Sequence, residues 1–325
     1  MRAVFIDVLL RHGFDESKAA TCAEVFASNS LDGVYTHGVN RFPRFIQYVQ
    51  TGHIDVNAEP VVKHAAGVLE QWDGRSGPGP LNAIAATERA IQLAKQNGVG
   101  CVALANTNHW MRGGYYAWQA AKANCILIAW TNTIANMPAW GAKDKRLGNN
   151  PFVIGVPFHK EAIVLDMALS QFSHGKLEVK SRSKEPLVVP GGYDETGNMT
   201  THATAILASG RMMPTGYWKG SGMSLLLDIL AMVLSGGKSV EQVTKTGIES
   251  GVSQVFIAID ITKLENYPGI NHAIDGVLAD YLASVPANEG ETILYPGQRV
   301  LQTRQENLEH GILVDGTIWQ EVLSL

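Results

Sequence analysis

The middle of the chain alternates segments typical of buried strands with segments of helical periodicity. Residues 100–105 and 126–130 are short, continuous apolar runs of the kind found in buried strands. Residues 81–96 and 115–123 repeat apolar side chains at the three- and four-residue spacing of one helix face. Elements that alternate in this way pack as helices over a central sheet. The sequence therefore predicts an α/β fold.

Both ends of the chain are helical in pattern. Three short amphipathic runs precede residue 50, and the part beyond residue 261 reads mostly as helix. We expect residues 1–66 and 262–325 to form a mainly helical domain. Residues 67–261 would then form an α/β domain that binds cofactor and substrate. A chain of 325 residues is long enough for two such units.

The α/β part contains further elements. Residues 68–72, 163–166 and 252–261 are typical of strands, and residues 222–235 predict a buried helix that ends at the two following glycines. Residues 179–216 are rich in Gly, Pro, Thr and Ser. We expect them to form an irregular insertion, which would suit a lid over a site.

No Gly-x-Gly-x-x-Gly run opens a helix after the first strand, so a doubly wound dinucleotide-binding fold is excluded. Motifs alone therefore do not indicate a nicotinamide cofactor. The run Gly220-Ser-Gly222 does precede a helix, and free backbone N–H groups there could hold a phosphate, with Lys219 adding charge. A helix start that uses small residues for packing explains the run equally well.

Composition excludes several classes of protein. The net charge is −4 and the basic residues are scattered, which gives no surface for nucleic acid or acidic membrane. Cys22, Cys101 and Cys125 are odd in number and form no Cys-x-x-Cys pair, which favours a reducing compartment and argues against structural zinc. The apolar run 225–234 is interrupted by Asp228 and is too short to cross a bilayer. We expect a cytoplasmic protein without a metal.

A candidate site lies in residues 33–45. His37 titrates near neutral pH and can give or take a proton. Arg41 and Arg44 are three residues apart, so on a helix their guanidinium groups could point the same way. Pro43 fits the first turn of that helix, which leaves His37 in the preceding loop. A proton donor beside fixed positive charge suits a small substrate with a carboxylate and a carbonyl. A surface turn with solvated arginines is the alternative.

The same segment resembles a signature of the malate/L-lactate dehydrogenase family that lacks a Rossmann fold. The resemblance runs in order along nearly the whole chain, through Thr36–Ile46, Glu70–Asp73, Asn108–Gly114, Trp130–Asn132, Trp140–Lys143, Gly148–Pro151, Leu165–Ala168, Gly216–Met223, Ser253–Ile259 and Tyr295–Gly297. It implies a central α/β sandwich domain, a helical domain built from both chain ends, a nicotinamide cofactor and a homodimer. It also identifies His37 as the family's proton donor.

By this resemblance, three segments hold NAD. They comprise Ala162, Ile163, Val164, Leu165, Asp166, Met167 and Ala168, then Trp218 and Lys219, and finally Gly297, Gln298 and Arg299. The third segment departs from the pattern, because a close family member carries Gly-His-Glu there. A glutamate accepts hydrogen bonds from a ribose, whereas Arg299 accepts none and would tolerate a 2′-phosphate. The choice between NADH and NADPH therefore stays open.

We expect an NAD(P)H-dependent oxidoreductase that reduces the C2 carbonyl of a 2-keto or 2,3-diketo sugar acid. His37 would protonate the carbonyl oxygen, and Arg41 would hold the substrate carboxylate with two hydrogen bonds. His109, which follows a predicted strand, would polarise or orient the substrate, or else pack under Trp110. Arg44 and Arg112 are candidates for the substrate's polar tail or for surface charge.

Other functions fit parts of the sequence. A malate-, L-lactate- or ureidoglycolate-type 2-hydroxy acid dehydrogenase shares the family signature. A lyase could use Lys143 or Lys219 as a Schiff-base amine, because a buried lysine readily loses its charge. A binding protein without catalysis would result if Arg299 had weakened cofactor capture. No Gly-x-Ser-x-Gly run is present, which argues against a hydrolase.

Overall fold

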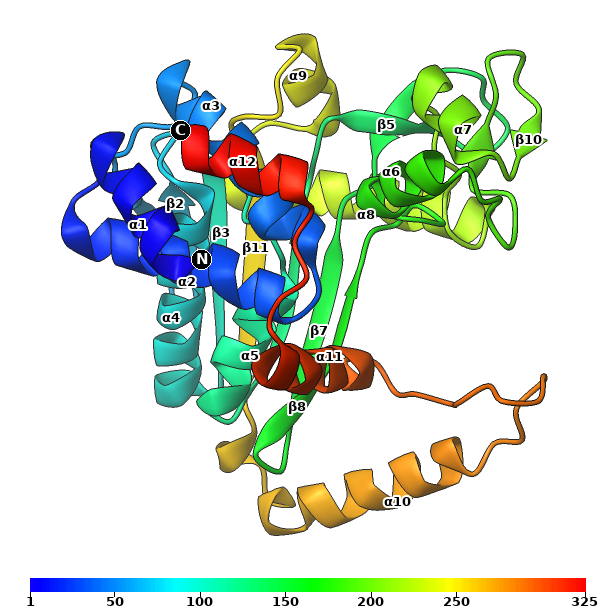
Figure 1. Cartoon of the computed structure of the whole chain (residues 1–325). Coiled ribbons are helices and arrows are strands. Elements are labelled where there is room, and N and C mark those ends of the chain that lie inside the picture. Colours follow the sequence, from blue (N-terminus) through cyan, green and yellow to red (C-terminus); the bar gives the residue numbers. More distant parts are fainter.

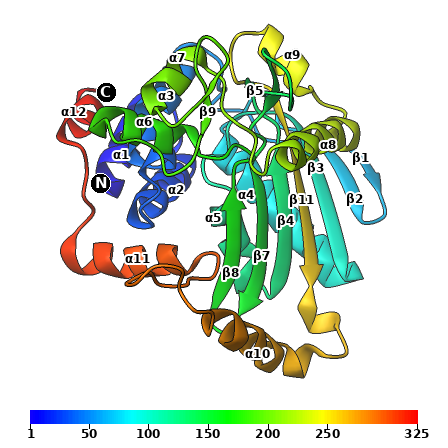
Figure 2. The ribbon, with the colours of Figure 1, turned by 90° about the vertical axis from the view of Figure 1, so that its right-hand side faces the viewer.

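In the computed structural model, which describes residues 1–325, a seven-stranded sheet runs through the protein (Figures 1 and 2). The strand order is β1-β2-β3-β11-β4-β7-β8, and every neighbouring pair is antiparallel except β2 and β3. The strands are β1 (Val61–Ala66), β2 (Leu69–Asp73), β3 (Val99–Thr107), β4 (Cys125–Thr131), β7 (Phe152–Phe158), β8 (Glu161–Met167) and β11 (Val252–Asp260). Two small ribbons pair β5 (Ala135–Pro138) with β6 (Lys145–Gly148), and β9 (Gly192–Tyr193) with β10 (Met199–Thr200). The predicted α/β class is confirmed.

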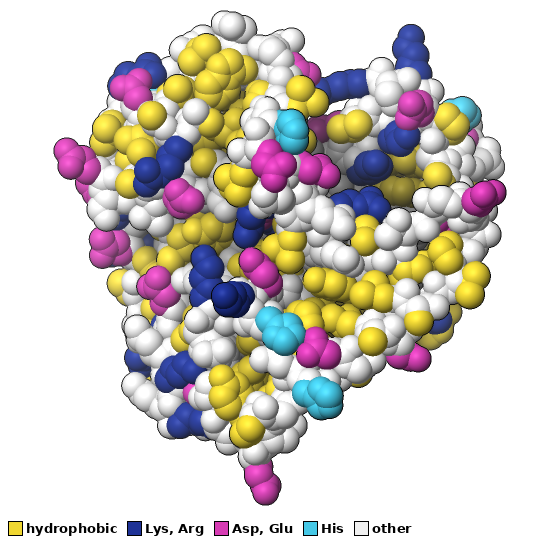
Figure 3. Space-filling model, turned by 60° about the horizontal axis from the view of Figure 1, so that its bottom comes forward, with side chains coloured by type: hydrophobic (Ala, Val, Ile, Leu, Met, Phe, Trp, Pro, Cys, Tyr) yellow, Lys and Arg dark blue, Asp and Glu magenta, His cyan; other side chains and the backbone are white.

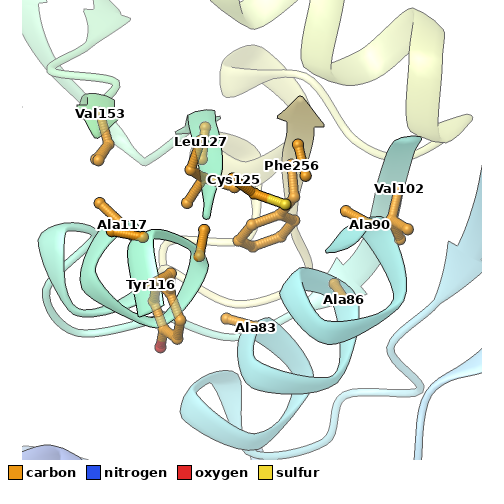
Figure 4. Packing of buried hydrophobic residues seen from close by; sticks show 14 of the residues in the cluster. Ala83, Ala86, Ala90, Val102, Tyr116, Ala117, Cys125, Leu127, Val153 and Phe256 are labelled. Atoms are coloured by element: carbon orange, nitrogen blue, oxygen red, sulfur yellow. The ribbon is translucent and has the colours of Figure 1, made fainter. Parts of the chain in front are cut away.

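Side chains on the central strands alternate between two cores. Val102 and Leu104 of β3 join the cluster under α4 (Gly79–Asn97) and α5 (Gly114–Lys122), whereas Ala103 joins the cluster under α8 (Trp218–Ser235). Successive strand residues point to opposite faces of the sheet, so the apolar run predicted as a buried strand contributes side chains to both cores. Figure 4 shows the first core, where small α4 residues let the helix approach Phe256 of β11. The sheet is thus sandwiched between helices.

Helices from both chain ends share a separate core. The cluster contains side chains of α1 (Arg2–Arg11), α2 (Glu16–Leu31), α3 (Phe42–Gln50) and α12 (Gly316–Ser324). These helices lie together on one side of the protein, where both termini also lie (Figure 1). Of the other C-terminal helices, α11 (Gln298–His310) contacts α2, and α10 (Ile270–Leu282) has no buried residue. The remaining helical elements are α6 (His174–Ser183), α7 (Ala203–Ser209), α9 (Val240–Lys245), and the 3₁₀ turns η1 (Tyr35–His37), η2 (Val39–Arg41), η3 (Ile261–Lys263) and η4 (Tyr267–Gly269).

Two predictions about the ends and loops of the fold were wrong in detail. Residues 61–66, which we expected in the helical part, form the edge strand β1 of the sheet, because they pair with β2. Residues 179–216 are not wholly irregular, since they contain α7 and the β9–β10 ribbon. Apart from residues 61–66, the limits of the two domains stay a prediction, as does the role of residues 179–216 as a lid.

The helix α8 is only partly buried, contrary to prediction. Leu227 and Ala231 pack on the sheet, whereas Leu226, Ile229 and Val233 are exposed. Its apolar residues surround the helix, so one face has no partner within this chain. By length and composition alone, its 18 residues are enough to cross a membrane, and 33% of them are buried. Such a pattern equally suits a helix that another protein surface covers.

Candidate active site

Two histidines from separate elements stack on each other. His37 ends the turn η1, and His109 lies in the loop between β3 and α5; their ring centroids are 5.5 Å apart with an interplanar angle of 26°. Asn29 of α2 donates to the His37 backbone carbonyl at 2.9 Å, which holds the turn in place. The backbone N–H of Met111 donates to His109 Nδ1 at 2.9 Å, so neutral His109 carries its proton on Nε2. His109 therefore faces His37 rather than packing under Trp110.

Burial and nearby cations keep both imidazoles neutral. Burial first, and then Arg41 and Arg112, lower the pKa of His37 to about 3. Burial, Arg41, His37 and Arg44 lower the pKa of His109 well below its ordinary value. Perturbed histidines in a cluster of cations are typical of functional sites.

Arg41 and Arg44 make different contacts, although they are three residues apart. Arg41 Nη2 lies 3.9 Å from Glu249 Oε1, in the loop between α9 and β11. Arg44 Nη2 donates to Tyr48 Oη at 3.3 Å, and its guanidinium lies 5.6 Å from that ring. Arg44 also lines a separate hollow of about 580 Å³ between α3 and α12. Of the two arginines, only Arg41 lies near a carboxylate, that of Glu249, which is also close to His109.

Arg112 is a buried structural cation, not a surface charge. Its side chain is 4% exposed and pairs with Asp32, the residue after α2, which also accepts from Arg304 Nε of α11 at 2.6 Å. Its Nε lies 3.6 Å from Asp166 Oδ2 at the end of β8. The Trp118 ring lies beneath it, with its centroid 4.8 Å from the guanidinium carbon. Arg112 thus connects the His37 region to the strand predicted to hold NAD.

The first and third predicted cofactor segments come together. The backbone N–H of Val164 donates to the Pro296 carbonyl at 3.1 Å, which places Gly297 against β8. Gly297 has a φ of +93°, and a Cβ there would lie 3.0 Å from Val164 N, so only glycine fits without strain. Ala162 and Val164 are core residues, so they offer only backbone atoms to a ligand. Gln298 and Arg299 open α11 directly beyond this contact.

The second predicted segment lies just beyond β8. The backbone N–H of Thr215 donates to the Leu169 carbonyl at 2.8 Å, which brings the start of α8 beside the strand end. Trp218 is 65% exposed there. The predicted phosphate cradle was wrong, however, because the N–H groups of Lys219, Gly220 and Ser221 already donate to backbone carbonyls.

The exposed positions of Lys143 and Lys219 remove the basis of the Schiff-base alternative. That chemistry required a buried lysine which readily loses its charge. Neither lysine has such an environment here.

Sequence reasoning missed Asp32, Arg304 and Glu249. Asp32 and Arg304 occur in helical regions whose charge pattern gives no sign of pairing. Glu249 lies in a short loop, which is fixed because the adjacent Ser250 donates to Asn108 Oδ1 at 3.0 Å. The only sequence signal for Glu249 was its position in a loop immediately before the strand predicted at residues 252–261.

Comparisons with known proteins assign the chain to a family. The family model described as malate/L-lactate dehydrogenase matches residues 1–323. The chain belongs to this family. It is similar to 2,3-diketo-L-gulonate reductase of Escherichia coli (strain K12 / DH10B), with 45% identity over 327 residues, covering 100% of this chain and 98% of the relative. The predicted resemblance and the prediction of an oxidoreductase are confirmed.

Solved structures agree with the fold. The sulfolactate dehydrogenase of Methanocaldococcus jannaschii is 29% identical, with a TM-score of 0.88 and coverage of 100% of this chain and 96% of that one. The malate dehydrogenase of Pyrococcus horikoshii OT3 is 28% identical, with a TM-score of 0.89 and coverage of 98% and 91%. The predicted malate/L-lactate dehydrogenase-like fold is therefore confirmed.

Proposed function

We propose that the protein reduces the C2 carbonyl of a 2-keto sugar acid with a nicotinamide cofactor, and that His37 is the proton donor. The observation that carries this proposal is the stacked pair of His37 and His109 beside the Arg41 cation, in a chain of this dehydrogenase family. The relatives named 2,3-diketo-L-gulonate reductase suggest 2,3-diketo-L-gulonate as the first substrate to test.

The residues around Asp166 fit a dinucleotide. Asp166 Oδ2 accepts from the Gly114 N–H at 2.8 Å, its side chain is 23% exposed, and its other oxygen can accept from a ribose hydroxyl. Trp218 offers an exposed ring, and Lys219 offers a cation beside it. When bound, the reduced nicotinamide supplies the hydride. It would be held, as NADH or NADPH, by residues 162–168, Trp218, Lys219 and 297–299.

Arg41 and His37 would act together on the substrate. Arg41 would bind the substrate carboxylate, which orients the adjacent carbonyl. A carboxylate at Arg41 also cancels one of the two cations that lower the pKa of His37. Binding would therefore raise the pKa of His37 toward the range in which a protonated imidazole can donate to the developing alkoxide. His109, with its proton on Nε2, would orient the carbonyl from the other side of the stack.

We also propose a cytoplasmic homodimer. The exposed apolar residues of α8 lie on one uncovered face, and α10 adds Val277, Tyr281 and Leu282, also exposed. Figure 3 shows the underside of the protein, where hydrophobic side chains form patches among charged and polar ones. A second copy that covered such surface would remove it from water. Three free cysteines fit a reducing compartment.

The test is turnover followed at 340 nm with each cofactor and a panel of 2-keto and 2,3-diketo acids. His37→Ala should lose roughly 10²–10⁴ in kcat while cofactor binding, followed by NADH fluorescence, is kept. Arg41→Ala should raise KM for every carboxylate substrate. Wild-type turnover that survives intact in both variants would contradict the proposal. A complete lack of cofactor binding in the wild type would instead favour the non-catalytic alternative.

A further inference from the structure

Glu249 is the one carboxylate placed between the two substrate-facing groups. Its Oε1 lies 3.9 Å from Arg41 Nη2 and 3.8 Å from His109 Nε2, and its side chain is 14% exposed. Both contacts use the same oxygen. The second oxygen, Oε2, makes no hydrogen bond within the protein, so it retains its full capacity to accept one.

Hydrogen bonds made by the Ser250 and Asn108 side chains fix this position. Ser250 Oγ donates to Asn108 Oδ1 at 3.0 Å, and the preceding residue, Glu249, lies against His109. Asn108 is itself held, because its Nδ2 donates to the Ser76 carbonyl at 2.8 Å and the Gly77 carbonyl at 3.0 Å. The carboxylate therefore does not depend on a mobile loop to reach the site.

Another carboxylate near Arg41 is already engaged. Glu178 of α6 lies 3.3 Å from His174 Nδ1 on the same helix and is half-exposed. The hydrogen bond from His174 lowers the pKa of Glu178. Glu249 has no such local partner, and its nearest charges are those that we assign to substrate binding and catalysis.

We propose that Glu249 determines specificity by accepting a hydroxyl group of the substrate and rejecting a second carboxylate. This inference rests on the proposed function, because it requires Arg41 to hold the substrate's first carboxylate. Glu249, which is next to Arg41, then lies beside the part of the substrate's carbon chain that follows the keto group. A hydroxyl there donates to Oε2, whereas a second carboxylate meets like charge in a partly buried place. The substrate class is thus a hydroxylated 2-keto monocarboxylate rather than a 2-keto dicarboxylate.

Pyruvate, hydroxypyruvate and oxaloacetate test this directly. All three carry the same 2-keto carboxylate, and they differ only in the substituent on C3, which is hydrogen, a hydroxyl or a second carboxylate. The proteins are the wild type, Glu249→Gln, and the matched control Glu241→Gln, which removes an exposed charge on α9. For each we would measure kcat/KM, and also the dissociation constant by calorimetry without cofactor.

Glu249→Gln should lower the hydroxypyruvate-to-pyruvate ratio and raise the oxaloacetate-to-pyruvate ratio, each roughly tenfold to a hundredfold, as for a hydrogen bond to a charged group. Glu241→Gln should change neither ratio. If Glu249→Gln lowered kcat/KM equally for all three compounds, Glu249 would only hold Arg41 and the inference would be overturned. Unchanged kcat/KM ratios between the compounds would overturn it for the same reason. A wild type that binds none of the three compounds would also overturn it. Binding with the expected ratios but without reduction by either cofactor would instead refute the proposed function alone.

Discussion

Replacing His37 by asparagine should make the protein less sensitive to acid. Burial, Arg41 and Arg112 lower the pKa of His37 to about 3, whereas an unfolded histidine has a pKa of about 6.5. Between these values the unfolded chain binds a proton that the folded chain does not, so the free energy of unfolding decreases as the pH falls. Each pH unit costs about 1.4 kcal/mol, and pH 5 lies about 1.5 units below the unfolded value. The loss from His37 at pH 5 is therefore about 2 kcal/mol.

Urea titrations at pH 7.5 and pH 5 measure this loss. The wild type should lose about 2 kcal/mol more than His37→Asn between the two pH values, while the other ionisable groups contribute to both proteins. Equal losses in the wild type and His37→Asn would refute the reasoning, because His37 would then accept a proton in the folded protein as easily as in the unfolded one.

Three further predictions concern other parts of the protein. Asp32→Ala leaves buried Arg112 without its closest counter-charge and should cost about 3–5 kcal/mol of unfolding free energy in urea titrations; a loss below about 1 kcal/mol would contradict the buried pairing. Arg299→Glu should weaken NADPH binding more than NADH binding in fluorescence titrations, because a glutamate repels a 2′-phosphate; equal effects would show that Arg299 does not contact that group. Leu226→Asp should convert the proposed dimer to a monomer in sedimentation velocity, and an unchanged mass would exclude α8 from the interface.

Periodicity in the sequence was enough to predict most of the sheet and its covering helices. The helix α4 is amphipathic and ends where Gly98 adopts a φ of +89°, and β3 is a run of small apolar residues that needs burial on both faces. The same reasoning failed for α8. Apolar residues all around a helix predict burial, but the sequence does not say whether the cover comes from the same chain.

Two parts of the candidate site were predictable from the sequence: the short motif that contains His37 and Arg41, and His109, which follows a predicted strand. His37 and Arg41 occur in one short motif, and their residue types already indicate proton transfer and carboxylate binding. Glu249 reaches Arg41 across about 200 residues of chain, through a loop that precedes β11. Such a contact depends on which strands become neighbours in the sheet, and single-sequence patterns do not specify strand order.

The charges around His37 explain why Arg41 matters more than Arg112 for its pKa. Arg112 belongs to a group with Arg304, Asp32 and Asp166, in which two positive and two negative side chains offset each other. Arg112 and Asp32 can be buried because their charges are paired, and pairing weakens the field of Arg112 at His37. Arg41 has only the 3.9 Å contact with Glu249, so its charge acts on the imidazole with less compensation. An anion that binds Arg41 therefore changes the proton affinity of His37 more than one that binds elsewhere, which links substrate binding to the proton that the reaction consumes.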